Sequence, residues 1–180
     1  MTFSSLVNAL YNNFKAKKEK KLRKMKDDFL NEAIIRNSKL FFELSVTAYV
    51  LSKILSKPKF LVNRYKDELQ GIEKQLRQFR DGVGKKSDQQ FLVILNEIYS
   101  IIKTMEEEDK RFFRDIISKG RVKMAATMYA KGVSVGVACD MGEVDQQEML
   151  DYAGETMMFD RVKEEVSIKE RVKRARKLLK

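Results

Sequence analysis

Apolar residues recur at spacings of three and four along most of the chain, which is the period of an amphipathic α-helix. The first apolar stripe consists of Phe3, Leu6, Val7, Leu10 and Phe14. It fades across a polar gap and resumes at residues 22–30, so we expect one long helix over residues 3–35. Three further stripes predict helices over residues 39–56, 59–80 and 89–118.

Residues that begin or end helices separate these stripes. Ser38 is placed to cap the helix at 39–56, and Pro58 breaks that helix and opens the next, because proline is tolerated in a first helical turn. The run at residues 81–86, DGVGKK, is the clearest loop. Lys119-Gly120 has the composition of a helix C-terminus. No strand-like alternation of useful length is present, so the predicted fold class is all-α.

After residue 120 the predicted helices become short, and the last of them is rich in Lys and Arg. Glycines at positions 142 and 154 are expected to end two of them. Asp145 is the expected N-cap of one helix, with Glu148 three residues on in a capping-box arrangement. The predicted ranges are residues 121–131, 134–141, 145–153 and 167–180.

Together these elements predict a helical bundle with long N-terminal helices over residues 1–118, which includes a basic N-terminal helix. A small helix-turn-helix-like module follows at 119–160, and a basic C-terminal helix at 161–180. A helix-turn-helix needs a small residue where its helices cross and favours glycine where the chain reverses. The residues expected to form its core are Ala138, Gly142, Val144, Asp145 and Leu150.

The segment at residues 128–142, MYAKGVSVGVACDMG, is followed by EMLDY at residues 148–152. It resembles the pattern Y-x-x-G-x-S-x-G-x-A-A of small antitoxin-type helix-turn-helix proteins, and the C-terminal part of an uncharacterised archaeal helical family. The resemblance implies a helix-turn-helix in this part of the chain. The sequence departs from the pattern at Cys139, where a second Ala is usual, and at Glu143, which lengthens the turn.

The charge of this module argues against direct reading of DNA. Residues 140–160 contain seven acidic residues and no Lys or Arg. DNA is a dense line of negative charge, and a recognition helix is normally surrounded by cations that contact phosphates. We therefore interpret the segment as a compact helical subdomain or a surface that docks another protein.

Positive charge is concentrated in two other segments, and the chain as a whole has a net charge of +11. With charge on every face, the first segment is expected to project into solvent or to lie against an acidic partner. Its candidate nucleic-acid-binding residues are Lys15, Lys17, Lys18, Lys20, Lys21, Arg23, Lys24 and Lys26. The alternative is a solvated helical extension. Either this segment or the second, residues 169–180, could instead dock on the acidic 140–160 surface of another copy and form a homo-oligomer.

The composition removes the residues that most enzymes use. The chain has no His, which is the commonest general base and metal ligand. Its single cysteine, Cys139, cannot form an internal disulfide and is expected to be buried. The N-terminus lacks the features of a signal peptide, and no apolar run is long enough to span a membrane, so we expect a cytoplasmic protein without a transmembrane segment. No catalytic, cofactor-binding or metal-binding residues are expected.

The sequence therefore predicts a non-enzymatic regulatory or adaptor protein that acts through protein–protein contacts or self-association. The alternative is a nucleic-acid-binding protein that uses the basic helices at 15–26 and 169–180, with the helix-turn-helix as scaffold.

Overall fold

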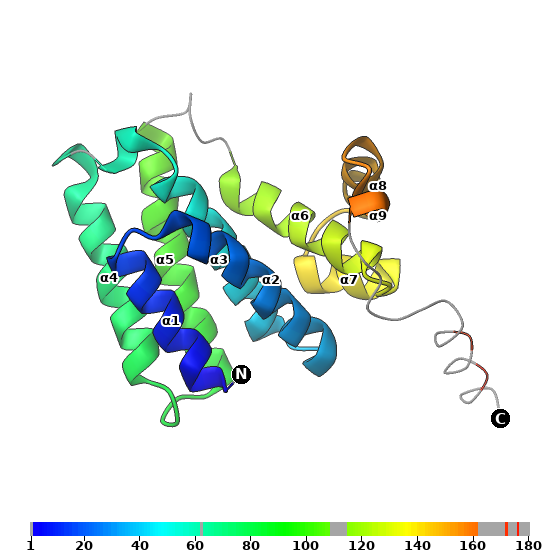
Figure 1. Ribbon diagram of the computed structural model, residues 1–180, viewed down its shortest axis with the longest axis horizontal. Coiled ribbons are helices and arrows are strands. Elements are labelled where there is room, and N and C mark those ends of the chain that lie inside the picture. Colours follow the sequence, from blue (N-terminus) through cyan, green and yellow to red (C-terminus); the bar gives the residue numbers. More distant parts are fainter. Residues whose placement is uncertain (1, 62, 109–114, 162–171, 173–175, 177–180) are drawn as a thin grey trace. The chain divides into compact units, whose positions relative to one another are not determined.

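The computed structural model describes residues 2–61, 63–108 and 115–161, together with 172 and 176 (Figure 1). Within those residues the secondary structure is helical and contains no strand, which confirms the all-α fold class. The chain forms two compact units, Met1–Ile117 and Ser118–Lys180.

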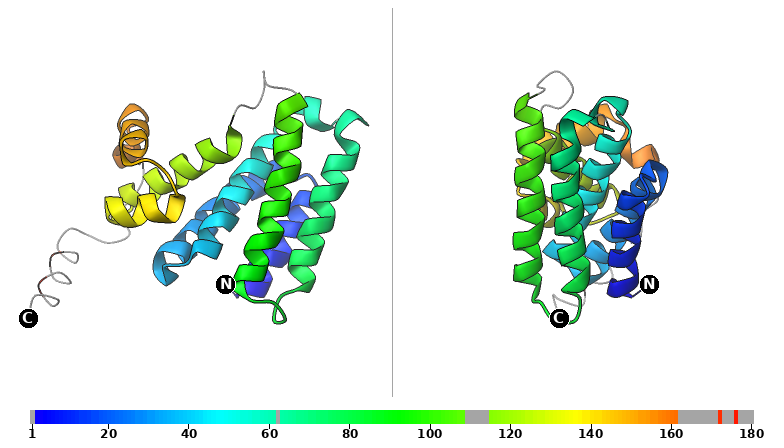
Figure 2. Two further views of the ribbon diagram at one scale, coloured as in Figure 1. Left: turned by 180° about the vertical axis from the view of Figure 1, so that it is seen from behind. Right: turned by 90° about the vertical axis from the view of Figure 1, so that its left-hand side faces the viewer.

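The first unit is a bundle of five helices that run in alternating directions along the chain (Figures 1 and 2). Helices α2 and α3 pack side by side, and α4 contacts both α1 and α5. Two short 3-10 turns, η1 (Pro58–Leu61) and η2 (Asn63–Tyr65), connect α3 to α4. The bundle helices are α1 (Phe3–Lys15), α2 (Glu19–Arg36), α3 (Lys39–Leu55), α4 (Lys66–Asp81) and α5 (Asp88–Glu108).

The single long helix predicted over residues 3–35 is wrong, because the chain reverses between α1 and α2. Lys17 adopts the left-handed conformation with φ 51°. The N–H of Lys18 donates to the carbonyl of Asn13 at 2.8 Å, and that of Lys17 to the carbonyl of Phe14 at 2.9 Å. This bond pair is a Schellman motif, which ends a helix and is usually built on glycine. No Gly or Pro marks the reversal in the sequence.

Two other helix boundaries in the first unit differ from the prediction. The helix expected from residue 59 begins at Lys66, after a connection that buries Tyr65 completely. The helix expected over residues 89–118 is described as far as Glu108, and a separate helix begins at Ile116. The predicted cap of α3 is confirmed, since the hydroxyl of Ser38 accepts from the N–H of Phe41 at 3.5 Å. Caps act locally and are readable in sequence, whereas the other two boundaries depend on packing.

Four aromatic rings close the end of the bundle where the chain begins. Phe3 from α1 lies 5.5 Å from Phe41 of α3 and 5.7 Å from Phe91 of α5, measured between ring centroids. Phe79 of α4 lies 4.4 Å from Phe91. Edge-to-face and tilted rings at these distances add to the free energy gained by burial. The cluster therefore joins four of the five helices.

Helix α3 is buried on nearly all sides and carries a carboxylate, Glu43, that is 2% exposed. The hydroxyl of Tyr99, on α5, donates to Glu43 Oε2 at 2.8 Å, and Lys39 Nζ lies 3.1 Å from Oε1. The hydroxyl of Thr47 lies 3.1 Å from that of Tyr99. A buried carboxylate without donors is costly, so this network holds α5 in register with α3.

The second unit consists of short helices: α6 (Ile116–Ala130), which begins at the unit boundary, α7 (Val135–Gly142), α8 (Gln146–Glu155) and α9 (Met158–Arg161). The predicted N-cap at Asp145 is confirmed, since its side chain accepts from the N–H of Glu148 at 3.0 Å. Ser134 caps α7 in the same way and accepts from the N–H of Val137 at 3.4 Å. The turn between α7 and α8 is three residues long.

Three glycines that were expected to follow helices lie inside them instead. Gly120 is within α6, Gly142 is the last residue of α7, and Gly154 is within α8. Glu143 takes the left-handed conformation, with φ 51°, that the prediction gave to Gly142. A glycine inside a helix costs about 1 kcal/mol relative to alanine, which burial of neighbouring side chains offsets. Apart from residues 172 and 176, the helix predicted at 167–180 lies outside the described residues.

Replacing Tyr99 by Phe should lower the free energy of unfolding by about 1–3 kcal/mol, because a buried carboxylate loses a hydrogen-bond donor. Urea unfolding followed by circular dichroism measures the change. Tyr129→Phe is the matched control, since the described residues give its hydroxyl no hydrogen bond. Equal stability of the Tyr99→Phe and wild-type proteins would contradict a structural role for the network.

Replacing Lys17 by Gly should raise the free energy of unfolding by about 0.5–1 kcal/mol. Glycine adopts the left-handed conformation without strain, and this gain exceeds the entropy that glycine adds to the unfolded chain. Asn37 is also left-handed, with φ 49°, but asparagine tolerates that conformation, so Asn37→Gly should gain less. The same urea unfolding experiment compares the two variants, and a larger gain at residue 37 would refute the argument.

Candidate polyanion-binding site

Six lysines surround the reversal between α1 and α2, and we call them the lysine turn: Lys15, Lys17, Lys18, Lys20, Lys21 and Lys24. All six are exposed, and none forms an ion pair with a carboxylate of the described residues. The two other predicted residues differ. Arg23 pairs with Glu19 at 2.7 Å, and Lys26 pairs with Asp27 while its side chain is only 15% exposed. The structure therefore separates the eight predicted residues into six available cations and two engaged ones.

The lysine turn faces solvent because α2 has an apolar side. Leu22 is fully buried and Met25 is 6% exposed, which corrects the expectation of charge on every face. Residues 20, 21 and 24 of α2 follow helical spacing of three and four, so they share a side of the helix away from the buried one. The buried side fixes the helix, and the cations are presented together as a consequence.

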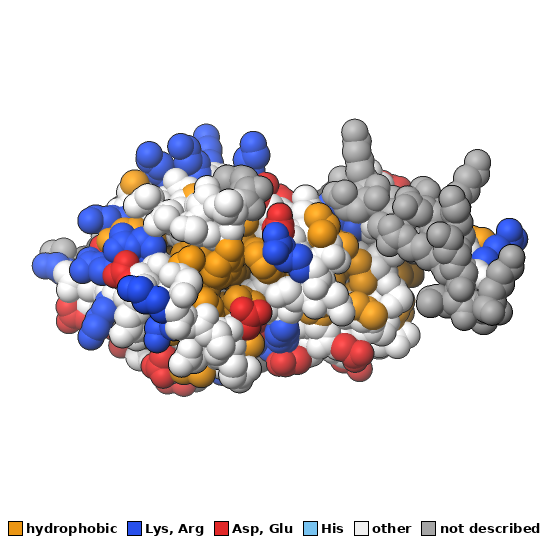
Figure 3. All heavy atoms as spheres, turned by 90° about the horizontal axis from the view of Figure 1, so that it is seen from below, with side chains coloured by type: hydrophobic (Ala, Val, Ile, Leu, Met, Phe, Trp, Pro, Cys, Tyr) orange, Lys and Arg blue, Asp and Glu red, His pale blue; other side chains and the backbone are white. Residues whose placement is uncertain are grey.

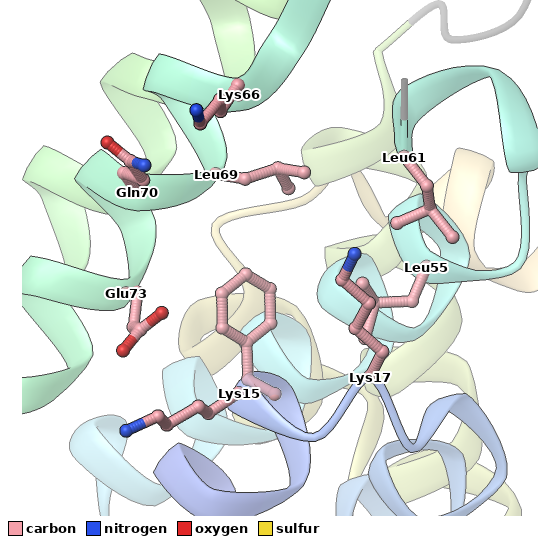
Figure 4. Close-up of a pocket in the computed structure, with 9 residues that line it drawn as sticks. Lys15, Lys17, Leu55, Leu61, Lys66, Leu69, Gln70 and Glu73 are labelled. Atoms are coloured by element: carbon pink, nitrogen blue, oxygen red, sulfur yellow. The ribbon is translucent and has the colours of Figure 1, made fainter. Parts of the chain in front are cut away.

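A hollow of about 300 Å³ lies beside the lysine turn in the first unit (Figure 4). Lys15 and Lys17 from the turn and Lys66 from α4 are among its lining residues. In Figure 4 the amino group of Lys17 points into the hollow, whereas those of Lys15 and Lys66 point away from it. Its other lining residues are Phe14, Leu55, Leu61, Leu69, Gln70 and Glu73.

Glu73, the one carboxylate among those lining residues, is already engaged by neighbours. The hydroxyl of Tyr11 donates to its Oε1 at 3.3 Å, and Arg77 Nη2 lies 3.3 Å from the same oxygen. The guanidinium of Arg80 lies 4.5 Å from the centroid of the Tyr11 ring, within the range of a cation–π contact. Glu73 therefore pairs with Arg77 and forms no ion pair with the lysine turn among the described residues.

A second basic cleft, of about 450 Å³, lies along the second half of α4 and the loop after it. Four of its lining residues are cations, namely Lys74, Arg77, Lys85 and Lys86, and Asp81 is the acidic one. Figure 3 shows Lys and Arg side chains gathered over one part of the face that it draws.

Sequence reasoning missed this second cleft, because residues 81–86 were interpreted as a turn without a role. The available signal was the helical spacing of Lys74 and Arg77, which puts both on one side of α4 ahead of Lys85 and Lys86.

The two units differ in charge. Residues 1–117 contain 24 Lys and Arg against 16 Asp and Glu, whereas residues 118–160 contain 4 against 7.

The residues expected to form a helix-turn-helix core lie in different environments. Ala138 and Gly142 are buried, Val144 and Leu150 are half-buried, and Asp145 is exposed at the start of α8. Glu143 Oε2 lies 2.6 Å from Arg121 Nη1 of α6, so an ion pair accompanies the left-handed turn residue. The exposed residues of α8 include Glu148 and Asp151 but no cation.

Cys139 is buried, as the sequence predicts. Burial raises the pKa of its thiol, and the nearby carboxylates of Asp140 and Asp145 raise it further. A raised pKa lowers the thiolate fraction at neutral pH, so this cysteine is a poor nucleophile.

The described residues contain no group of three or more Cys, Asp or Glu side chains that could hold a metal ion. Among the same residues, no helix combines the length and apolar character needed to cross a membrane.

Comparison with known proteins gives no relative. No protein-family model matches the chain, and no curated protein or solved structure is similar to it. The resemblance of residues 128–152 to antitoxin-type proteins therefore stays a prediction.

Proposed function

We propose that the chain is a non-enzymatic nucleic-acid-binding protein whose first unit contacts the phosphate backbone through the lysine turn. The observation that carries this proposal is the group of six exposed lysines that have no carboxylate partner among the described residues. Each lysine that neutralises a phosphate releases a condensed counterion, and this release drives association. Lysines already held in ion pairs would gain less, because their own pair must first be broken.

The surroundings of the lysine turn favour phosphate contacts over contacts with bases. Tyr11 and Phe14, the nearest aromatic residues in sequence, are 4% and 5% exposed, so they offer no platform for base stacking. The described cations of the turn are all lysines, which act as point charges and lack the fork with which arginine reads guanine. We therefore expect binding with little sequence preference and strong salt dependence.

The same surroundings argue against a membrane surface as the partner. A helix that lies on a membrane inserts apolar side chains beside its cations. Leu22 and Met25, which alternate with the lysines, are buried in the bundle. The turn therefore has charge without an apolar anchor.

The basic cleft on the second half of α4 is a second place for phosphates. The α4 residues that line it, between 74 and 81, follow those that line the hollow beside the lysine turn, between 66 and 73. The centres of the two sets are about 12 Å apart along the helix, so a polyanion with several phosphates can contact both places.

A second candidate function is docking of another protein, or of a second copy, by the second unit. In residues 118–161 of this unit three large apolar side chains are exposed: Val137 is 43% exposed, Met157 63% and Phe159 52%. Val137 lies in α7, Met157 directly before α9 and Phe159 in α9. The helix between them in sequence, α8, is acidic. Exposed apolar side chains with charged neighbours are typical of interaction surfaces, although a single exposed one is ordinary.

Replacing Lys20 and Lys24 by Gln should weaken binding to a mixed-sequence DNA duplex and to an RNA duplex. Two lost phosphate contacts should reduce the slope of log K against log salt by about 1.8 for DNA. Fluorescence anisotropy at salt concentrations between about 50 and 300 mM measures both the affinity and the slope.

Lys103 and Lys119 are the matched control, because both are exposed and their replacement by Gln changes net charge by the same amount. If both double variants lose the same affinity, the lysine turn is not the site and only net charge matters. Binding to neutral and anionic lipid vesicles is measured in parallel, and a preference for anionic vesicles over nucleic acid would overturn the proposal.

Replacing Met157 and Phe159 by Ser should reduce self-association or partner binding if the second unit is the docking surface, because both side chains lose apolar contact area. Sedimentation velocity over a range of protein concentrations measures self-association. Val93→Ser is the control variant, because Val93 is 53% exposed but lies in α5 of the first unit. A wild-type protein that stays monomeric at all concentrations rules out the second-copy form of this function.

A further inference from the structure

We propose that the hollow beside the lysine turn binds the anion of a medium-chain fatty acid. This ligand is different from the nucleic acid proposed above. The hollow and the lysine turn share Lys15 and Lys17. It is built by α1, the reversal after it, the end of α3, η1 and the first half of α4.

Apolar side chains from four elements form the walls. Phe14 of α1 and Leu55 of α3 are 5% and 7% exposed, and Leu61 of η1 and Leu69 of α4 are half-buried. Figure 4 shows the side chain of Leu69 directed toward that of Leu61. Ligand sites combine such apolar walls with a small number of placed polar groups.

One cation is placed at these walls. Figure 4 shows the amino group of Lys17 pointing into the hollow, which Leu55, Leu61 and Leu69 also line. Lys17 has no carboxylate partner among the described residues. Its left-handed backbone, φ 51°, carries a strain that glycine would avoid. A lysine held at a glycine-type position, with its charge over apolar side chains, suits a ligand with one negative charge and an apolar body.

The charge on the other side of the hollow favours a carboxylate over a phosphate head group. Glu73 lines the hollow and points into it in Figure 4, so it places one carboxylate beside a bound anion. A phosphate monoester carries about −1.5 to −2 at neutral pH and would be repelled more strongly than a single carboxylate. Lysine also offers a compact point charge that one carboxylate can match.

The volume limits the length of the chain. The hollow measures about 300 Å³, at the lower end of the range for ligand pockets. Taking a methylene group as roughly the size of a water molecule, about 30 Å³ each, the hollow accommodates about eight to ten carbons. Octanoate is therefore the probe of choice.

The test is calorimetric titration of the full chain with sodium octanoate, octanol, octylammonium and octyl phosphate. We expect octanoate to bind at least tenfold more tightly than octanol and octylammonium, and more tightly than octyl phosphate. Lys17→Gln should weaken octanoate binding at least tenfold. Lys20→Gln with Lys24→Gln is the control and should leave octanoate binding unchanged, because neither lysine lines the hollow.

Leu69→Trp fills the hollow and should abolish octanoate binding while leaving DNA binding unchanged. Circular dichroism checks that this variant folds, and Lys17→Gln, at an exposed position, provides a second test if it does not. The proposal is overturned if octanoate does not bind at millimolar concentration, if octanol or octylammonium binds equally well, or if Lys17→Gln has no effect. Tighter binding of octyl phosphate would overturn the carboxylate assignment. If the wild-type protein binds octanoate but does not bind DNA, only the nucleic-acid proposal is contradicted.

Discussion

The burial of α3 is the constraint on which the first unit depends. Almost every side chain of this helix is inaccessible to water, so the neighbouring helices must each present an apolar side to the bundle. The carboxylate of Glu43 is buried with them, and it is tolerated because Tyr99 donates a hydrogen bond to it and Lys39 forms an ion pair with it. An apolar core specifies burial but not registration, whereas these polar contacts fix how α5 lies along α3. Once the apolar sides face inward, the charged residues of α2 and α4 have no place except the surface.

The lysine turn is a consequence of that arrangement. Leu22 and Met25 draw α2 onto the bundle, and the chain can only return from α1 by reversing within three residues. The reversal forces Lys17 into a left-handed conformation and brings lysines from the end of α1 and the start of α2 together. It also leaves a hollow where the turn meets α3 and α4. One packing requirement therefore produces the cation cluster, the strained residue and the cavity.

The sequence was sufficient to predict the fold class, the buried character of α3 and the caps at Ser38 and Asp145, because these depend on periodicity and on local hydrogen bonds. It could not show the reversal at Lys17, since no Gly or Pro stands there. The glycines at 120, 142 and 154 pointed to helix ends that tertiary packing overrides. The hollow joins residues from four elements, and the second basic cleft joins α4 to the loop after it, so neither is visible as a motif. The six available lysines were predicted, but ion pairing of Arg23 and Lys26 is set by the geometry of α2.

Lys17 links the two proposals for the first unit. Its ammonium group can neutralise one anion at a time, so a carboxylate held in the hollow removes that cation from the set available to phosphates. Coupling between two ligands is reciprocal, so the polyanion must weaken binding in the hollow by the same factor. Lys17 is one of six lysines in the turn, and the others lie outside the hollow except for Lys15. The coupling is therefore negative in sign and limited to about the contribution of a single phosphate contact, which makes it modulation of nucleic-acid binding rather than a switch.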